Sequence, residues 1–231
     1  MIKLIAFIPK RPDITIERFH IHWRAPHGEM AKGIVLFKRY VQGHRVASLD
    51  PGLGPTEYEG TAEILFDDLE AALAQGEDPL YAGQVGPDEA NFIDLSRLTY
   101  LYLSEHVITK GAPVQAADGG FKLVQAVRRR QEMSVDDFVQ GWSAEEPELA
   151  ARLNADRHVC CLTLPYHYEN GTALYDGVRE LRWSDLDAYR RARENTEAWS
   201  ALMASDVIDP TSSSSMMVEE FRLIWPEWAQ T

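Results

Sequence analysis

Cysteine is scarce in this sequence: two of the 231 residues, Cys160 and Cys161, and they are adjacent. Neighbouring cysteines cannot close a useful loop through a disulfide, and this pair lacks the CxxC or nearby histidine spacing of a zinc site. The cysteine pattern therefore favours a reducing compartment, so we expect a cytoplasmic protein and no metal bound by this pair.

Long apolar runs and basic charge are also scarce. No window approaches 18 consecutive apolar residues, which argues against a membrane span. The short apolar start, residues 1–9, lacks a basic flank and a cleavage site and is typical of a strand. Lys and Arg number 23 against 36 Asp and Glu, a net charge of −13. Such a surface repels phosphate backbones and anionic lipids, so neither nucleic acid nor a membrane is an expected partner.

The motifs of common cofactor sites are missing as well. There is no GxGxxG before a helix, no P-loop and no GxSxG elbow. Nothing in the sequence calls for a nucleotide, a flavin or haem, so the chemistry we expect is independent of a cofactor.

What the sequence does contain is an internal repeat. Four anchors recur in order at offsets of 117 to 119 residues: 19–23 at 138–142, 39–41 at 157–159, 58–64 at 175–181, and 66–70 at 183–187. Four ordered matches with nearly constant spacing are hard to obtain by chance. The hydrophobic content of 45% in 231 residues suffices for two small cores or one large one.

Each copy follows a β-α-β-β-α-β pattern. In the first, we expect strands at residues 3–8, 38–47, 58–66 and 98–107, and helices from a Thr15 cap to about residue 32 and from an Asp68 cap to about residue 75. Pro26 should bend the first helix, and residues 76–91 are expected to form a loop. In the second copy, a strand at 121–127, a helix capped by Ser134, a serine loop at 212–215 and a final strand at 216–224 are expected.

This pattern predicts the fold class and the domains. Residues 1–108 and 121–231 should each form a ferredoxin-like α+β repeat, joined by a linker at 109–120. Such a unit leaves one sheet face uncovered. The two antiparallel sheets are therefore expected to face each other as an α+β barrel within one chain. Exposed helices could still pair two chains as a homodimer.

The first copy resembles the EthD family, within the dimeric α+β barrel superfamily. The similarity spans about residues 2–108 and depends on matching segments in order: Phe19, Trp23, His27-Gly28, Ala31, residues 39–44 (RYVQGH), 58–60 (YEG), 66–69 (FDDL) and 105–107 (EHV). In the second copy, Glu146 stands in place of His27, and residues 160–162 replace Gln42-Gly43-His44. The second copy thus resembles a degenerate partner that closes the barrel.

The resemblance implies a fold and a pocket but no single reaction. Family members are linked to degradation of ethers and aromatics or to polyketide tailoring, and related barrels include cyclases, decarboxylases, dehydratases, isomerases and monooxygenases. We expect an enzyme, most simply a lyase that removes a small fragment in aromatic catabolism. A cofactor-free or haem-linked monooxygenase is the second hypothesis. A non-catalytic binding or accessory module is the third.

The candidate site residues come mostly from two strands and one helix. Strand alternation places Tyr40, Gln42 and His44 on one face, and Tyr100, Tyr102, Ser104 and His106 on one face of the last strand. Aromatic and hydrogen-bonding side chains there, rather than Lys and Glu, are typical of a semi-enclosed pocket. Interior packing is the alternative. On the first helix, His27 lies four residues after Trp23 and shares its face, and His22 lies near the flank.

We therefore predict His27 or His44 as the proton-transfer group and Tyr40 as a catalytic hydrogen-bond donor. Substrate-binding roles are predicted for Trp23, Gln42, His22, Tyr100, Tyr102 and His106. The expected substrate is a small hydrophobic, aromatic compound. A zinc site made by His27, His44 and His106 is disfavoured, because no histidine pair within one element supports it.

Overall fold

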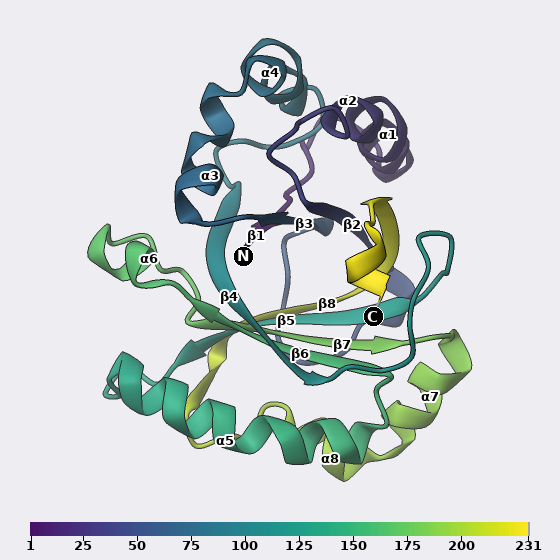
Figure 1. Cartoon of the computed structure of the whole chain (residues 1–231). Helices are drawn as coiled ribbons and strands as arrows, with labels where there is room; N and C mark the ends of the chain where they lie inside the picture. Colours follow the sequence, from purple (N-terminus) through teal and green to yellow (C-terminus); the bar gives the residue numbers. More distant parts are fainter. Residues whose placement is uncertain (231) are drawn as a thin grey trace.

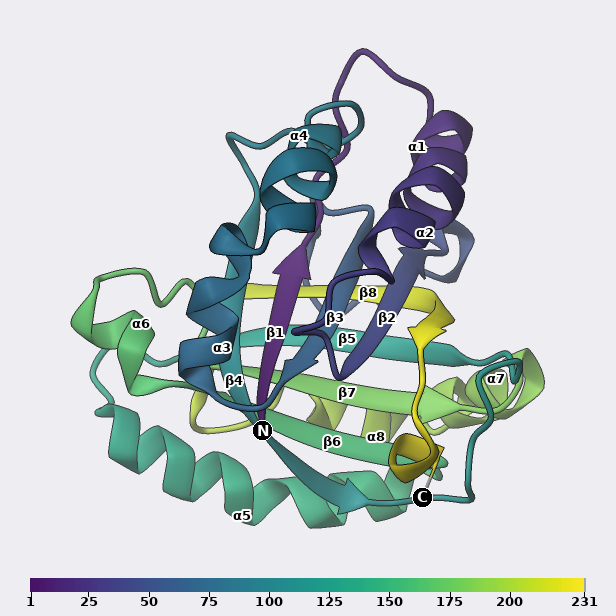
Figure 2. The same cartoon turned by 45° about the horizontal axis from the view of Figure 1, so that its top comes forward.

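Eight antiparallel strands close into a barrel in this computed structural model, which describes residues 1–230 apart from the side chain of Ala150. Thr231, the last residue of the second predicted repeat, lies outside the described residues. Around the barrel the strands follow the order β1-β3-β2-β8-β5-β7-β6-β4 (Figures 1 and 2). Their bounds are β1 Ile2–Phe7, β2 Arg39–Arg45, β3 Gly60–Phe66, β4 Thr99–Thr109, β5 Phe121–Arg129, β6 Arg157–Thr163, β7 Gly177–Trp183 and β8 Ile208–Ile224. The predicted closed α+β barrel within one chain is confirmed.

Each half of the chain supplies four neighbouring strands of this barrel. The first half contributes β4-β1-β3-β2 and the second contributes β8-β5-β7-β6, so equivalent strands occupy equivalent places. Two antiparallel seams join the halves, β2 with β8 and β4 with β6. Because both edges of each sheet are paired, neither sheet has a free edge among these strands.

The helices lie outside the barrel, in two groups. Figure 1 shows the first-half helices together on one side and α5, α7 and α8 on the opposite side. The first group comprises α1 Ile16–His22, a π-helical turn Trp23–His27, α2 Gly28–Ala31, α3 Leu69–Leu73, a π-helical turn Tyr81–Val85 and α4 Gly86–Glu89. The second comprises α5 Val135–Leu153, α6 Pro165–Glu169, α7 Leu186–Glu194 and α8 Thr196–Ala201. Helix α6 stands apart and packs near β4.

Three predicted helix starts are confirmed. The side-chain oxygens of Thr15, Asp68 and Ser134 each accept a hydrogen bond from a backbone N–H three residues on, at 3.2, 2.9 and 3.1 Å. These bonds satisfy donors that a helix leaves unpaired at its first turn. The expected distortion at Pro26 is also present, as the π-helical turn Trp23–His27. A proline has no N–H for the helical ladder, and π turns relieve such interruptions.

Two sequence predictions of loops are wrong. Residues 76–91 contain the π-helical turn Tyr81–Val85 and α4 rather than a loop alone. The helical backbone runs from this π-helical turn directly into α4, and Pro87 lies just after the turn. The serine run 212–215 lies inside β8, where Ser214 and Ser215 pair with Ala126 and Gln125 of β5. Pairing across the barrel overrides the low strand preference of serine.

Alternation along the strands divides the side chains between the barrel interior and the helix-covered face. On β1, Ile5 and Phe7 join an interior cluster with Leu101 and Leu103, whereas Leu4 packs outward under the first-half helices. The interior cluster fills one end of the barrel. The other end contains buried charged side chains, among them Lys3.

Candidate functional site

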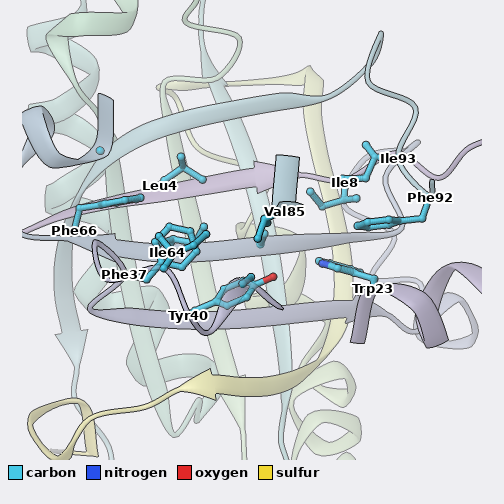
Figure 3. Close-up of a cluster of buried hydrophobic side chains, with 14 of the residues drawn as sticks. Leu4, Ile8, Trp23, Phe37, Tyr40, Ile64, Phe66, Val85, Phe92 and Ile93 are labelled. Atoms are coloured by element: carbon cyan, nitrogen blue, oxygen red, sulfur yellow. The ribbon is translucent and has the colours of Figure 1, made fainter. Parts of the chain in front are cut away.

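A cavity of about 310 Å³ lies between the outer face of the first-half sheet and the helices that cover it. It is therefore outside the barrel interior. Its lining is mostly apolar: Leu4, Ala6, Ile8, Trp23, Ala31, Phe37, Ala62, Ile64, Ala72, Leu73, Gly76, Val85, Ile93 and Leu98. The polar side chains in the lining are His27, Tyr40, Gln75, Tyr81, Glu89, Tyr100 and Tyr102. Figure 3 shows Tyr40 and Ile64 on the strands of the first-half sheet, and Trp23, from the π-helical turn, with its ring nitrogen directed toward the Tyr40 hydroxyl. Such a lining suits a small apolar ligand with few polar atoms.

His27 is the imidazole that lines this cavity. It is 5% exposed, and its Nδ1 lies 3.0 Å from Oδ2 of Asp88. Since a carboxylate only accepts, Nδ1 carries the proton, and Nε2 is left as a base. Burial lowers the pKa of His27, an effect that Asp88 partly offsets. The ring is therefore neutral at pH 7 and able to accept a proton.

Asp88 forms hydrogen bonds with the imidazole rings of two histidines, His22 and His27. His22 Nε2 lies 3.0 Å from both Asp88 oxygens, but His22 does not line the cavity. Burial acts against the charge of Asp88, yet hydrogen bonds from Asn91, His22 and His27 lower its pKa overall. Asp88 is thus a stable anion that fixes the tautomer of His27. His22 thus contacts this carboxylate rather than the cavity, and its substrate-binding role stays a prediction.

Glu89 is a second proton-transfer group in the cavity wall. Burial raises its pKa to about 7, although a hydrogen bond from the Tyr81 hydroxyl, 3.0 Å long, acts in the opposite direction. A carboxyl with this pKa is present in both protonation states near neutral pH. The cavity therefore holds a neutral imidazole and a carboxyl that can act as an acid.

Tyr40 reaches the cavity from β2. It is 2% exposed, and burial raises its pKa to about 12, so it keeps its proton and can donate it in a hydrogen bond. Its oxygen accepts from Nε2 of Gln42, 2.9 Å away, and the same nitrogen donates to the Trp23 carbonyl at 2.9 Å. Gln42 is fully buried and does not line the cavity. It holds Tyr40 and Trp23 in place instead.

His44 lies in the wall behind Trp23 rather than in the cavity. The two rings stack with centroids 4.4 Å apart, and the two Nδ1 atoms of His44 and His20 are 2.8 Å apart. Burial lowers the pKa of His44 to about 3, helped by His20 and Arg24. Strand alternation correctly places His44 on the outer face, but the indole of Trp23 covers that part of the face.

The β4 residues divide between the cavity and the surface. Tyr102 is buried in the lining, and Tyr100 is 46% exposed at its edge. Helix α6 of the second half supports this wall, since His167 Nε2 accepts from the Tyr102 backbone N–H at 2.7 Å. His106 lies farther along β4, is exposed, and contacts Ser104. The structure does not bring it near His27.

Sequence reasoning missed Gln75, at the expected end of a helix, and Tyr81, Asp88 and Glu89, in the segment 76–91 expected to form a loop. The Oε1 atom of Gln75 is buried against the cavity and has no hydrogen-bond partner among the described residues. A ligand hydroxyl could supply the missing donor. The one available signal was Pro87 followed by two acidic residues, a pattern that favours a helix start.

The equivalent place in the second half is filled by an ion pair. Glu146, at the position of His27, is fully buried against Arg179 of β7, and its Oε2 lies 2.6 Å from His158. The Arg179 guanidinium also donates to Gln125 at 2.5 Å. Glu146, His158 and Arg179 are all fully buried, so charged side chains occupy this place in the second half.

Two kinds of feature are not found among residues 1–230. No group of three or more His, Cys, Asp or Glu side chains is arranged to hold a metal ion in that part of the chain. None of its helices is long and apolar enough to cross a membrane.

Comparison with known proteins identifies a family for the first half. Residues 11–96 match the EthD domain. The predicted resemblance is confirmed for that segment. No curated protein matches the sequence.

Solved structures match over nearly the whole chain. An anthrone oxidase-like protein has a TM-score of 0.66 at 9% identity, covering 96% of this chain and 92% of that one. A protein provisionally named a monooxygenase from Fusobacterium nucleatum has a TM-score of 0.55 at 11% identity, covering 96% and 92%. One so named from Lactobacillus acidophilus has a TM-score of 0.51 at 14% identity, covering 96% and 93%. At these identities the likeness extends to the fold alone.

Proposed function

We propose that this chain, whose residues 11–96 match the EthD domain, is an enzyme that binds a small aromatic molecule in its first-half cavity and removes a proton from it with His27. The observation that carries this proposal is the hydrogen bond from His27 Nδ1 to Asp88, 3.0 Å long, at the wall of an otherwise apolar cavity. It leaves Nε2 as a base, where a weakly acidic O–H or C–H would be presented to it.

The proposed site also includes Tyr40, Glu89 and Trp23. The Tyr40 hydroxyl keeps its proton and can donate it to a phenolate or enolate oxygen as negative charge develops there. Glu89, with a pKa of about 7, can return a proton to the product. Trp23, Tyr100 and Tyr102 provide aromatic walls. Gln42 and His22 act through these groups, and the proposed site leaves out His44 and His106, which do not line the cavity.

The charge of the lining favours a neutral substrate. Among the described residues that line the cavity there is no Lys or Arg, and Glu89 would repel an anion when ionised. A substrate carboxylate would lose its hydration without a cation to replace it. Decarboxylation, one form of the lyase chemistry predicted from the sequence, is therefore disfavoured. Dehydration of a neutral substrate stays as a second candidate.

Oxygenation without a resident cofactor is the reaction that best fits a neutral carbon acid. With anthrone as a probe, His27 would remove a C10 proton, and the resulting anion would react with dioxygen to give a hydroperoxide. Loss of water from that intermediate gives anthraquinone, so anthrone and one O₂ yield anthraquinone and one H₂O. The names of the fold neighbours support the choice of probe.

We also propose that the chain consists of two ferredoxin-like repeats, residues 1–108 and 121–231, joined by residues 109–120. The matching strand orders of the two halves support this division. The filled counterpart of the cavity supports a single working site in the first repeat.

The test is turnover of anthrone by wild type, His27→Gln and His44→Gln, with oxygen uptake and anthraquinone formation measured together. We expect His27→Gln to lower kcat at least about ten-fold, the range typical of a general base. His44→Gln is the matched control and should keep most of the activity, because His44 does not line the cavity. Because anthrone cannot give anthraquinone without an oxidant, a wild type that neither takes up oxygen nor forms anthraquinone would refute the oxygenation. Equal activity in wild type and His27→Gln would refute the role of His27.

A further inference from the structure

A second, charged cavity lies at one end of the barrel interior. Ten ionisable side chains surround this end, six basic and four acidic: Lys3, Arg39, Lys122, Arg157, Arg182 and Arg222, with Glu63, Glu105, Glu180 and Glu220. All except Lys3 line a cavity of about 40 Å³. None of them lines the apolar cavity described above. The proposed reaction therefore has no use for this cluster.

The four carboxylates are shared among the cations. Lys122 lies 2.5 Å from Glu63 and 3.1 Å from Glu220, and Glu220 also pairs with Arg182 at 3.2 Å and Arg222 at 2.7 Å. Burial acts against the negative charge of Glu63, but Lys122 and Lys3 lower its pKa to about 2. Against the same effect of burial, neighbouring cations also lower the pKa values of Glu105 and Glu220, so these three carboxylates stay ionised. Six cations face four carboxylates at this end of the barrel, and the Asp118 carboxylate also acts on Arg222 from outside the strands, so the cations outnumber the carboxylates by one.

The other three cations of the cluster are Lys3, Arg39 and Arg157. Lys3 pairs with Glu180 and lies 3.2 Å from Glu63, and Arg39 lies 2.8 Å from Glu105. Arg157 donates to the backbone carbonyl of Lys110 at 3.1 Å. A carbonyl group satisfies a donor but leaves the charge of the guanidinium in place.

Arg222 shows most clearly that a partner is missing. It is 9% exposed, and its Nη atoms donate to Glu220 and to the backbone carbonyls of Gln115 and Asp118. Its Nε is buried and has no hydrogen-bond partner among the described residues. Burial lowers the pKa of Arg222, and the charge of Arg182 acts in the same direction against the attraction of Glu220. A buried donor on a cation ordinarily has a partner, and an anion is the most favourable one.

We propose that the charged cavity at the end of the barrel binds one small anion, of the size of a halide or a single carboxylate group, against Nε of Arg222. The anion offsets the excess positive charge and satisfies the unpaired N–H. The volume of about 40 Å³ accommodates such an ion but not a larger molecule. Ala112, Val114, Trp225 and Gln230 line the cavity from outside the strands. A bound water would satisfy Nε but leave the charge excess, and only an anion does both.

The direct test is a bromide soak of crystals of the wild-type protein. We expect an anomalous peak inside the barrel end, in contact with Arg222. A cavity that contains water alone, with no peak after soaking, would overturn the proposal. This measurement needs no variant, so it decides the question even if substitution at Arg222 prevents folding.

The second test compares anion binding by wild type, Arg222→Gln and the surface control Arg190→Gln, at constant ionic strength. The midpoint of thermal unfolding is measured against sodium bromide and, separately, sodium formate. We expect saturable stabilisation of wild type and of Arg190→Gln, because an ion that binds only the folded state stabilises it. Loss of a charge-assisted hydrogen bond should weaken the apparent affinity at least about ten-fold in Arg222→Gln. An identical response in all three proteins would indicate a general salt effect and contradict a site at Arg222.

Discussion

At the scale of single residues, Glu89 gives the candidate site its dependence on pH. Burial raises the pKa of this carboxyl from 4.5 to about 7, so folding favours its protonated form. Its contribution to stability is therefore complete below pH 4.5 and is lost as pH rises to 7. Above pH 7 the folded protein holds a buried carboxylate that opposes folding.

Glu89→Gln should remove this dependence. Relative to wild type, its free energy of unfolding should increase between pH 4.5 and pH 7.5, by at most about 3 kcal/mol for a shift of this size. Urea unfolding at several pH values measures the difference. The control is Glu70→Gln, since Glu70 is exposed on the same half and its substitution should give a difference that hardly changes with pH. A constant difference for Glu89→Gln would show that this carboxyl is not desolvated.

The sequence predicts some positions of the candidate site and misses others for a physical reason. The two-residue period of a strand places Tyr40 and Tyr102 on the face that the cavity uses. The period cannot show what covers each position, so it does not separate Tyr40 from His44, which lies behind Trp23. Asp88 reaches His27 across 61 residues of sequence, and no local pattern encodes such a contact.

At the scale of elements, one contact between a helix and a strand explains the strongest part of the internal repeat. A Cβ at Gly60 of β3 would lie 2.6 Å from the Trp23 ring and 2.2 Å from the Gly43 carbonyl. A Cβ at Gly177 of β7 would lie 2.1 Å from the Trp142 ring. In both halves the strand therefore needs a glycine so that the tryptophan of the first helix can lie directly on it. The repeated Gly and Trp positions are one packing requirement occurring twice.

Gly60→Ala and Gly177→Ala should both destabilise the protein by about 1–3 kcal/mol, the usual cost of adding atoms to a closely packed core. Their effects on ligand binding should differ. Trp23 lines the cavity, so its displacement in Gly60→Ala should weaken quenching of tryptophan fluorescence by anthrone, whereas Gly177→Ala should bind like wild type. Equal weakening in both variants would indicate a general loss of structure rather than a local effect on Trp23.

A helix or strand can be predicted from the sequence where the residues that stabilise it lie close together in the chain. The caps at Thr15, Asp68 and Ser134 are each a side chain bonded to a backbone N–H three residues away, so the sequence contains both partners. The serine run inside β8 fails because its strand conformation comes from pairing with β5, about 90 residues earlier.

At the scale of the whole molecule, the barrel requires both halves. The first half alone would leave β2 and β4 as unpaired edges and would expose the interior faces of Ile5, Phe7, Leu101 and Leu103. In the intact chain β2 pairs with β8, which occupies in the second half the place of β4, and β4 pairs with β6, the counterpart of β2. Two copies of one half could therefore form the same seams with each other.

The charged residues at the barrel end should make the two halves of the chain differ in their ability to dimerise. The first half supplies Lys3 and Arg39 with Glu63 and Glu105, so a pair of first halves has four positive and four negative charges inside. The second half supplies four basic residues, Lys122, Arg157, Arg182 and Arg222, with two carboxylates, Glu180 and Glu220. A pair of second halves would bring eight of these positive charges together with four of these negative ones at the barrel end. Buried charge without compensation strongly opposes association.

We therefore expect a fragment of residues 1–110 to form a discrete dimer and a fragment of residues 111–231 to resist dimerisation. Light scattering coupled to size exclusion, over a range of protein concentrations, gives the mass of each species. Mixing the two fragments is the control, because it restores the charge balance and the apolar faces of the natural barrel and should give a one-to-one complex. If the second fragment dimerised as tightly as the first, the charged barrel end would not determine which halves can pair, and the seams alone would account for the assembly.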